Sequence, residues 1–211
     1  MYNEILKDRI EAAILLSEKL KKYKNSNSVV FAVPRGGVPL GYEIAKNLRL
    51  PLDIVLSKKI GHPSNKEFAI GAVSLDSSVL DKHPEVPKEY IKNEITRLRT
   101  VLRNKYKLYR GDREPLDIKA KNVILIDDGI ATGNTLLASI EMLRKRHPAK
   151  IIVAVPVLPY DTVPLFEKHT DELIYLIASK HFSGVGSFFE NFQQVEDDEV
   201  IQILEATYPL A

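Results

Sequence analysis

Apolar and polar positions alternate along the chain with two different periods. Over residues 4–23 apolar side chains recur every three or four positions, which predicts an amphipathic helix that ends at the polar run 25–28. Residues 29–33 form a short, wholly apolar run typical of a buried strand, helical spacing returns over 38–48, and 53–59 predicts a second strand. This part of the chain therefore predicts a helix followed by a strand, helix, strand unit.

The rest of the chain continues the alternation of strands and helices. Residues 61–68 have the composition of a loop, and 69–75 with 78–80 predict a short hairpin. Further helices are predicted over 87–109, 132–147 and 162–168, and further strands over 122–128, 151–157 and 172–178. This order predicts an α/β fold, a Rossmann-like parallel sheet with helices on both faces. No repeat or linker interrupts residues 1–211, so a single domain is expected.

Composition narrows the functional classes. The 211 residues carry 30 basic and 28 acidic side chains, a net charge of +2, so no global field favours a nucleic acid or a membrane as partner. The chain has no cysteine, which excludes disulfides and thiol nucleophiles and fits a reducing compartment. The N-terminus lacks the apolar core of a signal peptide, and the apolar runs are too short to cross a bilayer. A cytoplasmic location is expected.

The segment from Val123 to Thr135 carries the strongest chemical signal. An apolar strand ends in two adjacent carboxylates, and a turn rich in glycine and threonine then opens a helix. Vicinal hydroxyls can donate to such carboxylates, while amides and threonine hydroxyls at a helix N-terminus suit a phosphate. Ordinary helix capping needs only one Asp or Thr, so a sugar phosphate site explains the segment better. The candidate binding residues are Asp127, Asp128, Gly129, Ile130, Ala131, Thr132, Gly133, Asn134 and Thr135.

A second candidate loop follows the first core strand. Arg35, Gly36 and Gly37 offer unobstructed main-chain amides and one guanidinium, on which a pyrophosphate can lie. The alternative is a plain strand-to-helix turn. Because both candidate loops follow strands of a parallel sheet, we expect both at the edge where ligands bind such sheets.

Other basic residues give weaker signals of a binding site. Lys58 and Lys59 end the second predicted strand, where alternation directs at most one of them to a ligand, and we favour Lys59. Arg110 and Arg113 are expected in the loop before the motif strand, where a phosphate is within their reach, but a role in binding it is not favoured. The five histidines show no ligand spacing, and other phosphate-loop, dinucleotide, hydrolase and zinc motifs are absent.

The segment from Val123 to Thr135, with its hydrophobic run, acidic pair and Thr-Gly-Asn-Thr end, resembles the phosphoribosyl pyrophosphate (PRPP) motif of type I phosphoribosyltransferases. The resemblance spans nearly the whole chain and is closest to a bacterial group whose acceptor is not settled. It implies the type I fold, with a small hood contributed by about 1–25 and 179–211. It also implies a glycosyltransferase of nucleotide metabolism, in a family that often forms homodimers.

The resemblance assigns roles to the candidate residues. It implies that Asp127 and Asp128 hold the ribose diol, residues 132–135 the 5-phosphate, and Arg35 with neighbouring amides the departing pyrophosphate. The second substrate would be a nitrogen acceptor, a nucleobase-like ring. Arg35 and Asp128 are the candidate catalytic residues, Asp128 by helping to deprotonate the acceptor. Mg²⁺ would arrive with PRPP, with the acidic pair as additional contacts and no metal held by the protein alone.

Two further features follow from the resemblance. The family's pyrophosphate loop often contains a cis peptide, for which the bond between Arg35 and Gly36 is the candidate. The family's flexible catalytic loop corresponds to residues 61–71, which contain Lys66 and Glu67. A transferase is the expected function, and a regulatory protein that binds PRPP or a nucleotide without turnover is the alternative. Release of pyrophosphate in the presence of an acceptor distinguishes them.

Overall fold

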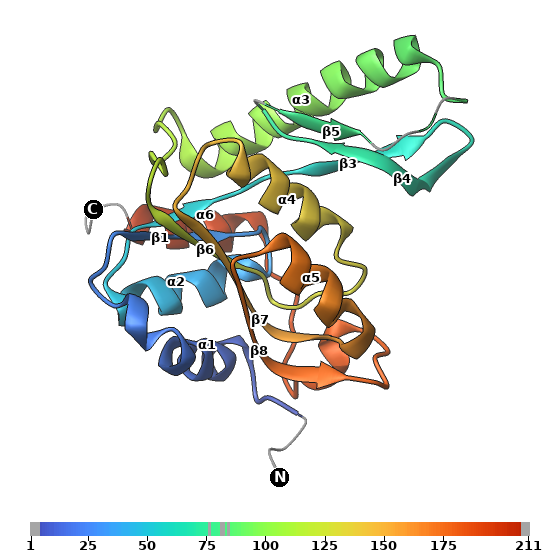
Figure 1. Cartoon of the computed structure of the whole chain (residues 1–211). Coiled ribbons are helices and arrows are strands. Elements are labelled where there is room, and N and C mark those ends of the chain that lie inside the picture. The colour runs from blue at the N-terminus through green and yellow to red at the C-terminus, as the bar shows by residue number, and fades with distance from the viewer. Residues whose placement is uncertain (1–4, 76, 81–82, 84, 208–211) are drawn as a thin grey trace.

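A computed structural model describes residues 5–75, 77–80, 83 and 85–207. Its centre is a five-stranded sheet in the order β2-β1-β6-β7-β8, in which every neighbouring pair is parallel (Figure 1). This sheet confirms the predicted α/β fold class. Its strands are β1 (Ser28–Ala32), β2 (Leu52–Ile54), β6 (Asn122–Ile126), β7 (Lys150–Pro159) and β8 (Glu172–Ser179).

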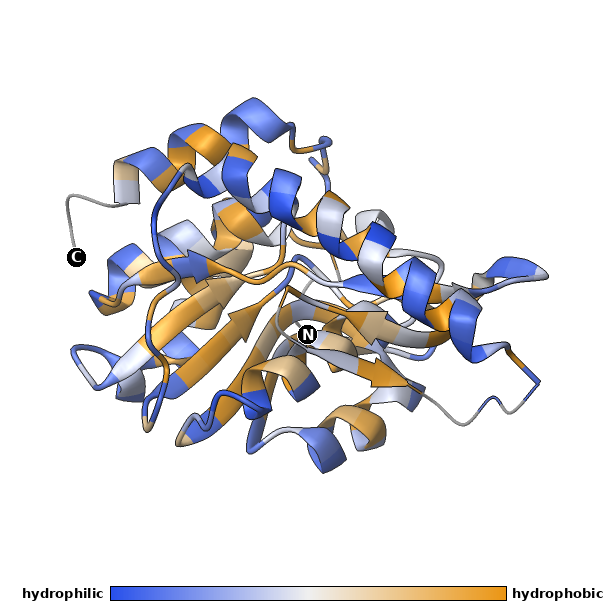
Figure 2. Cartoon of the chain, turned by 90° about the horizontal axis from the view of Figure 1, so that it is seen from above, coloured by the Kyte–Doolittle hydropathy of each residue, from blue (hydrophilic) through white to orange (hydrophobic). Residues whose placement is uncertain are grey.

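Helices cover both faces of the sheet, as predicted (Figure 1). Successive residues of β1 point to opposite faces: Val30 packs with the helices of one face and Phe31 with those of the other. Because both faces are buried, the central strands β1 and β6 are hydrophobic after their first residue, whereas the helices are divided into hydrophobic and hydrophilic sides (Figure 2). One face carries α1 (Arg9–Lys19), α2 (Gly37–Leu48) and α6 (Asp197–Thr207), and the other carries α4 (Asn134–Arg144) and α5 (Val163–His169).

The direction in which strands are added reverses between β1 and β6. From β1 the chain adds β2 on one side, and from β6 it adds β7 and then β8 on the other side. The loops that follow β1 and β6 therefore lie at the switch point, where doubly wound sheets bind their ligands. These are the two loops that carry the sequence motifs.

A second, antiparallel sheet lies beside the first and was not predicted as a unit. It contains β3 (Lys58–His62), β4 (Asn65–Val73) and β5 (Ser78–Leu80) in that order, and α3 (Lys88–Arg110) packs against it (Figure 1). The pairing of β4 with β5 confirms the predicted hairpin.

Two sequence predictions in this region are wrong. Residues 53–59 are not one strand, because β2 ends at Ile54 and β3 begins in the other sheet. Between them the chain turns to the helices: the main-chain N–H of Leu56 donates to the Tyr106 hydroxyl of α3 at 2.9 Å. Residues 61–68 are not a loop, since they contain the end of β3, a turn and the start of β4. This small sheet is largely exposed on one side, so its strands are too polar to resemble the central ones.

The predicted N-terminal helix over 4–23 starts later than expected, at Arg9. Asp8 is its N-cap, and Oδ1 of Asp8 accepts two main-chain N–H groups of the first turn at 2.9 Å each. After α1 a short 3-10 turn, η1 (Lys21–Tyr23), completes the predicted span. The apolar spacing before Asp8 reflects strand-like pairing rather than helix.

The two terminal segments meet. Leu6 forms an isolated parallel bridge with Phe189, and the N–H of Leu6 donates to the carbonyl of Phe188 at 2.8 Å. The C-terminal of these two segments follows β8 and includes the 3-10 turn η3 (Val185–Phe188). Elsewhere, the 3-10 turn η2 (Tyr160–Thr162) precedes α5. A hood built from these segments stays a prediction, and its outermost parts, 1–4 and 208–211, lie outside the described residues.

Candidate active site

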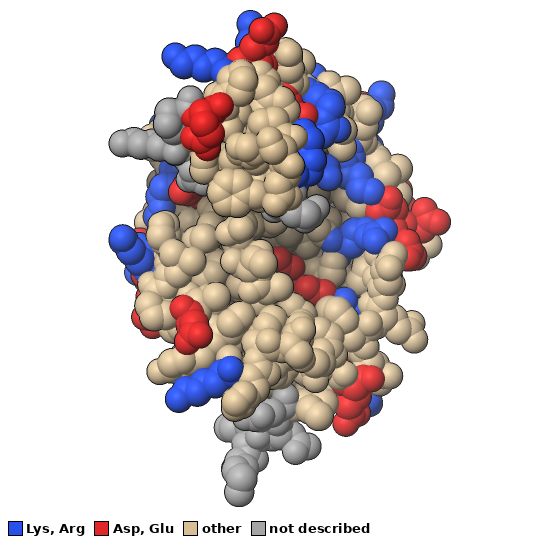
Figure 3. Space-filling model, turned by 90° about the vertical axis from the view of Figure 1, so that its right-hand side faces the viewer, with Lys and Arg blue, Asp and Glu red and all other residues tan. Residues whose placement is uncertain are grey.

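Asp127 and Asp128 directly follow β6 at the switch point. Both are partly exposed, and the side chain of Asp128 keeps 16% of its accessible surface. Oδ1 of Asp127 accepts the main-chain N–H of Asp128 at 2.9 Å. Burial, and next the charge of Asp128, raise the pKa of Asp127 well above its ordinary value. Figure 3 shows a face of the molecule that is hollowed at its centre, with acidic side chains on the floor of the hollow and basic ones on its rim.

Gly36 and Gly37 bring the loop after β1 against this acidic pair. A β-carbon at Gly36 would overlap the carboxyl group of Asp128, and one at Gly37 would lie 2.8 Å from the carbonyl oxygen of Ile126. The backbone of Gly36, with φ −59° and ψ −31°, suits any residue, so contact rather than conformation requires glycine there. The two loops predicted from the sequence are therefore in direct contact.

Two helix N-termini begin at the same edge of the sheet. Gly36 is the N-cap of α2, and Gly133, with φ +78°, is the N-cap of α4. Gly133 cannot supply a side-chain cap, so the first amides of α4 remain for water or a ligand. These amides and the helix dipole both favour an anion at α4. At α2 the N–H of Gly37 donates to the carbonyl of Val33 at 3.1 Å, the N–H of Val38 donates to that of Arg35 at 3.0 Å, and the next residue is a proline. An anion at α2 therefore depends on the helix dipole and on the loop before the helix.

Most of the predicted turn after the acidic pair is open to solvent, but Ile130 and Gly133 are buried. The side chain of Ile130 lies in the core, and its main-chain N–H donates to the carbonyl of Val157 at 2.9 Å. Ile130 is therefore a poor member of the candidate binding set, because a neighbouring strand already uses its donor. The exposed members of the turn are Ala131, Thr132, Asn134 and Thr135.

Arg35 points from its loop towards the start of α6. Its Nη1 lies 3.2 Å from Oε2 of Glu196 and 3.7 Å from Oδ1 of Asp197. These groups are solvated, so the ion pairs stabilise this orientation only weakly. The cis peptide predicted between Arg35 and Gly36 lies one bond earlier, between Pro34 and Arg35. Nothing in the residue types distinguishes the two bonds, which is why the sequence prediction was wrong.

Arg9, the first residue of α1, was missed by the sequence analysis. Its Nε and Nη2 both donate to Oδ2 of Asp128, at 3.1 and 2.7 Å. Its Nη1 donates to the carbonyl of Gln193 at 2.8 Å, and its guanidinium carbon lies 3.9 Å from the centre of the Phe192 ring. In the sequence Arg9 is one of many basic residues on a helix, and no local signal separates it from the others.

The side chain of Lys59 lies on the antiparallel sheet, beside the N-terminus of α4. Lys59 and Asn134 line one hollow of about 290 Å³, and Lys58 does not line it. Lys59 therefore stays the better candidate of the two lysines for a ligand at the motif turn. Its position differs from the prediction in one respect, since it belongs to β3 and not to the end of β2.

The segment 61–71, predicted as a flexible catalytic loop, forms most of the β3–β4 hairpin instead. Lys66 donates to the hydroxyl of Tyr90 in α3, and that hydroxyl donates to the carbonyl of Gly61 at 2.7 Å. Strand pairing and these bonds hold the segment against α3. The side chain of Glu67 lies outside the part of the chain that the structure describes.

Arg110 has a structural partner and is not placed to bind a phosphate. It is the last residue of α3, its side chain is 5% exposed, and its Nε donates to Oδ1 of Asp53 at 2.8 Å. Oδ2 of Asp53 accepts the main-chain N–H of Leu116 at 3.0 Å. A buried carboxylate of β2 thus neutralises Arg110, which agrees with the preference against a phosphate role for it. Arg113 is exposed.

The C-terminal segment contacts the motif turn. A β-carbon at Gly129 would overlap the side chain of Val185, so η3 packs directly over this turn. Phe182 and Phe188 of this segment stack on each other with ring centres 5.5 Å apart. Their faces are thus partly used within the protein.

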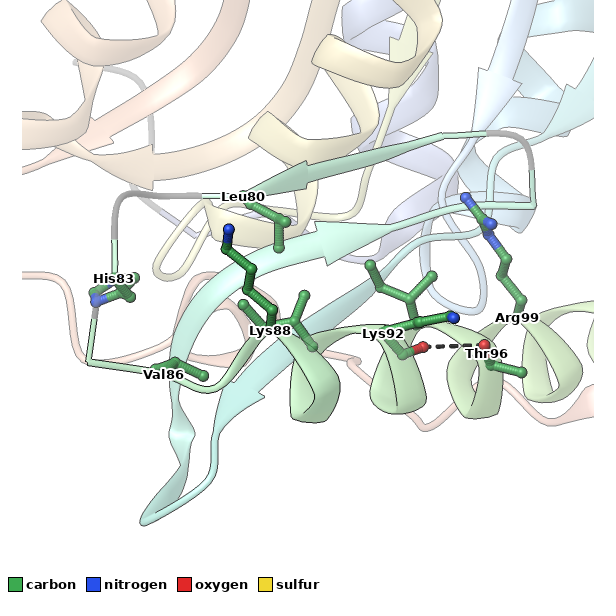
Figure 4. Close-up of a pocket in the computed structure, with 9 residues that line it drawn as sticks. Leu80, His83, Val86, Lys88, Lys92, Thr96 and Arg99 are labelled. Atoms are coloured by element: carbon green, nitrogen blue, oxygen red, sulfur yellow. Dashed lines mark hydrogen bonds between the residues drawn. The ribbon is translucent and has the colours of Figure 1, made fainter.

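A larger hollow, of about 860 Å³, lies away from the acidic pair, between β5 and α3 (Figure 4). Leu80 faces it from the strand, and Lys88 and Lys92 face it from the helix. Its floor is apolar, and it contains no carboxylate among the described residues. None of the residues predicted from the sequence as ligand-binding lines this hollow.

Two other features, a metal site and a membrane-spanning helix, are absent from the described residues. No group of three or more His, Cys, Asp or Glu side chains is arranged to hold a metal ion there. In the same part of the chain, every helix is too short or too polar to cross a membrane.

Known proteins and a family model resemble this chain over almost its whole length. The family model described as "Phosphoribosyl transferase domain" matches residues 1–199. A Mycobacterium tuberculosis H37Rv protein, provisionally named a phosphoribosyl transferase, is 31% identical over 210 residues, which cover 97% of this chain and 47% of the relative. The chain thus spans about half the length of the curated relatives it matches.

The crystal structure of TT1426 from Thermus thermophilus is similar with a TM-score of 0.87 and 34% sequence identity, covering 96% of this chain and 99% of that one. A shorter match joins 28% of this chain to 22% of a ribose-phosphate pyrophosphokinase of Pyrococcus furiosus, at 38% identity over 60 residues.

Proposed function

The chain belongs to the phosphoribosyl transferase domain family, and from this membership we propose that it transfers the ribose 5-phosphate group of PRPP to a nitrogen atom of a nucleobase-like acceptor. The observation that carries the proposal is the meeting of the acidic pair with the N-terminus of α4 and with the glycine loop before α2 at the switch point. Hydrogen-bond acceptors for a diol, main-chain donors for one anionic group and the Arg35 guanidinium for a second are thereby within one site.

Each part of PRPP has a matching surface in this proposal. The ribose hydroxyls donate to the carboxylates of Asp127 and Asp128. The 5-phosphate accepts from the first amides of α4 and from the hydroxyls of Thr132 and Thr135, which are exposed. The pyrophosphate lies on the loop before α2, with a rotated Arg35 as its cationic partner, while Lys59 lies beside the first turn of α4 and is the cation for the 5-phosphate.

The reaction breaks the bond between C1 of ribose and the pyrophosphate oxygen, which leaves with both electrons. A new bond forms from the acceptor nitrogen to C1, and the nitrogen loses its proton. Positive charge develops on the ribose ring next to the acidic pair, while negative charge develops on the pyrophosphate next to the glycine loop. The protein contributes by holding the reacting atoms in line and by fixed dipoles of matching sign.

The residues present fit a divalent cation that arrives with the substrate. The acidic pair supplies only two carboxylates, and Arg9 already occupies one oxygen of Asp128. Mg²⁺ prefers six oxygen ligands and keeps several waters, so pyrophosphate and diol oxygens suit it, with the acidic pair as a minor contributor. When bound, Mg²⁺ neutralises charge on the departing pyrophosphate.

The proton of the acceptor is better taken by Asp127 than by Asp128. A proton on Oδ2 of Asp128 would displace two guanidinium donors. Asp127, by contrast, has a raised pKa and accepts a main-chain N–H rather than a cation, which suits a proton acceptor. The expectation for Asp128 is revised on this ground.

The test is a pyrophosphate-release assay with PRPP, Mg²⁺ and a panel of purines, pyrimidines and other nitrogen heterocycles. We expect release that depends on at least one acceptor and that disappears in the Asp127→Asn/Asp128→Asn variant. PRPP binding without release for any acceptor would instead favour the regulatory alternative. Absence of PRPP binding would contradict both functions.

A further inference from the structure

Arg9 joins three parts of the molecule that are far apart in the sequence. Its guanidinium donates to Asp128, which is 119 positions away, and to the carbonyl of Gln193, which is 184 positions away. The ring of Phe192 covers its face. All five N–H donors of a guanidinium lie in one plane, so two edges and one face of Arg9 are engaged at once.

The contacts of Arg9 with Asp128 are largely removed from water. The Arg9 side chain is 12% exposed and that of Asp128 is 16% exposed. A carboxylate so placed needs a partner to compensate its desolvation, and Arg9 is the one cation that hydrogen-bonds it in the described residues. Arg9 therefore determines where Oδ2 lies, and it leaves Oδ1 of Asp128 for another donor.

The platform that holds Arg9 is built by both chain ends. Phe192 stacks on Phe189 with ring centres 5.0 Å apart, and Phe189 pairs with Leu6. The N–H of Asn191 donates to the carbonyl of Lys7 at 2.9 Å. Arg9 thus extends to the acidic pair from the place where the N-terminal and C-terminal segments are paired.

We propose that Arg9 is a positioning residue for the ribose-binding carboxylates, and that it makes pairing of the two terminal segments a condition for binding the ribose. This inference rests on the proposed function, because it assumes that Asp128 receives the ribose hydroxyls. It predicts that PRPP reaches full affinity only when Oδ2 is held by the guanidinium fork. It also predicts that removal of the Phe192 ring weakens PRPP binding, although Phe192 itself does not contact PRPP in this proposal.

Four variants and a control test the proposal. Arg9→Gln removes the charge, Arg9→Lys keeps the charge but loses the fork, and Asp128→Asn removes the partner. The combination of Arg9→Gln with Asp128→Asn completes a double-mutant cycle. Arg144→Gln is the matched control, since Arg144 donates to Asp171 through one guanidinium nitrogen in an exposed ion pair. For each protein we would measure urea unfolding and PRPP affinity by calorimetry with Mg²⁺.

We expect Arg9→Gln to weaken PRPP binding by about tenfold or more and Arg9→Lys by less, while Arg144→Gln stays within about twofold of the wild type. In the double variant the two losses should not multiply, since each alone already removes the pair. Equal PRPP affinity of wild type and Arg9→Gln, or losses that multiply, would overturn the inference.

Two safeguards keep the outcomes separate. If Arg9→Gln does not fold, Phe192→Leu removes the cation–ring contact alone, and an unchanged PRPP affinity of that variant would overturn the inference. If wild type itself does not bind PRPP, the proposed function fails. The unfolding cycle then still tests whether Arg9 and Asp128 are coupled, because it needs no ligand, and strictly additive effects would overturn the positioning role as well.

Discussion

The backbone of Gly36 lies so close to the carboxyl group of Asp128 that a β-carbon on the glycine would overlap it. The oxygen nearest to that β-carbon, Oδ2, is also the one that accepts both donors of Arg9. The position of the Asp128 carboxylate therefore depends both on the glycine loop and on a basic side chain. A change in either neighbour should move this carboxylate.

Gly36→Ala should displace Asp128 and lower both stability and PRPP affinity. The strain comes from contact and not from the backbone, because φ and ψ of Gly36 are helical. Overpacking of this kind costs about 1 to 3 kcal/mol, to be measured by urea unfolding. In an Asp128→Ala background the overlapping atoms are absent, so the same change should cost much less. A loss of stability that is equal in both backgrounds would show that the strain has another origin.

Asp127→Asn should alter the dependence of stability on pH. Burial and the charge of Asp128 raise the folded-state pKa of Asp127. Between the unfolded pKa of about 3.9 and the raised folded pKa, the folded state binds more protons, so the free energy of unfolding falls as pH rises. The amide lacks this slope, and the variant should therefore be more stable than wild type above that window. Denaturation at several pH values checks this, and a wild-type advantage at neutral pH would contradict it.

Asp53→Asn should destabilise the protein without a direct effect on PRPP. It leaves Arg110, which is 5% exposed, without its carboxylate partner. Removal of one partner of a buried ion pair costs about 3 to 5 kcal/mol. The free energy of unfolding is the readout, and PRPP affinity measured well below the melting temperature is the control. A specific loss of affinity in a stable variant would restore the phosphate role considered for Arg110.

Lys59→Met should weaken PRPP binding, and Lys58→Met should not. Lys59 shares a hollow with Asn134 at the start of α4, whereas Lys58 does not line it. One charge-assisted hydrogen bond to a phosphate group contributes about 1.4 kcal/mol or more, which corresponds to about tenfold in affinity. Calorimetric titration of both variants compares two like substitutions on adjacent residues. The opposite ranking would place the ligand on the other face of β3.

The central fold and the acidic motif could be predicted because their signals are local. The strand β6 is apolar from Val123 to Ile126 because both faces of the sheet are buried, and Asp127 follows it directly. Gly36 and Gly37 follow the first core strand, and adjacent glycines are typical of a turn. In both loops the residues that predict the site are thus neighbours in the sequence.

The features that the sequence did not predict depend on contacts between residues far apart in the chain. Arg9 and Asp128 are 119 positions apart, and Arg110 and Asp53 are 57 apart. Neither pair is marked in the sequence, because each basic residue lies among others with the same local pattern. The division of residues 53–59 between two sheets was missed for a related reason. After β2 the main-chain N–H of Leu56 donates to Tyr106, which lies 50 positions away in α3.

The most direct test of the account is a calorimetric titration of PRPP with Mg²⁺ into wild type and into Asp127→Asn/Asp128→Asn, with the exposed Asp112→Asn as control. Two charged hydrogen-bond acceptors are lost together, so we expect the affinity of the double variant to fall by roughly 100-fold, with folding intact and the control unchanged. An unchanged affinity in a folded double variant would contradict the assignment of the ribose site to these two carboxylates.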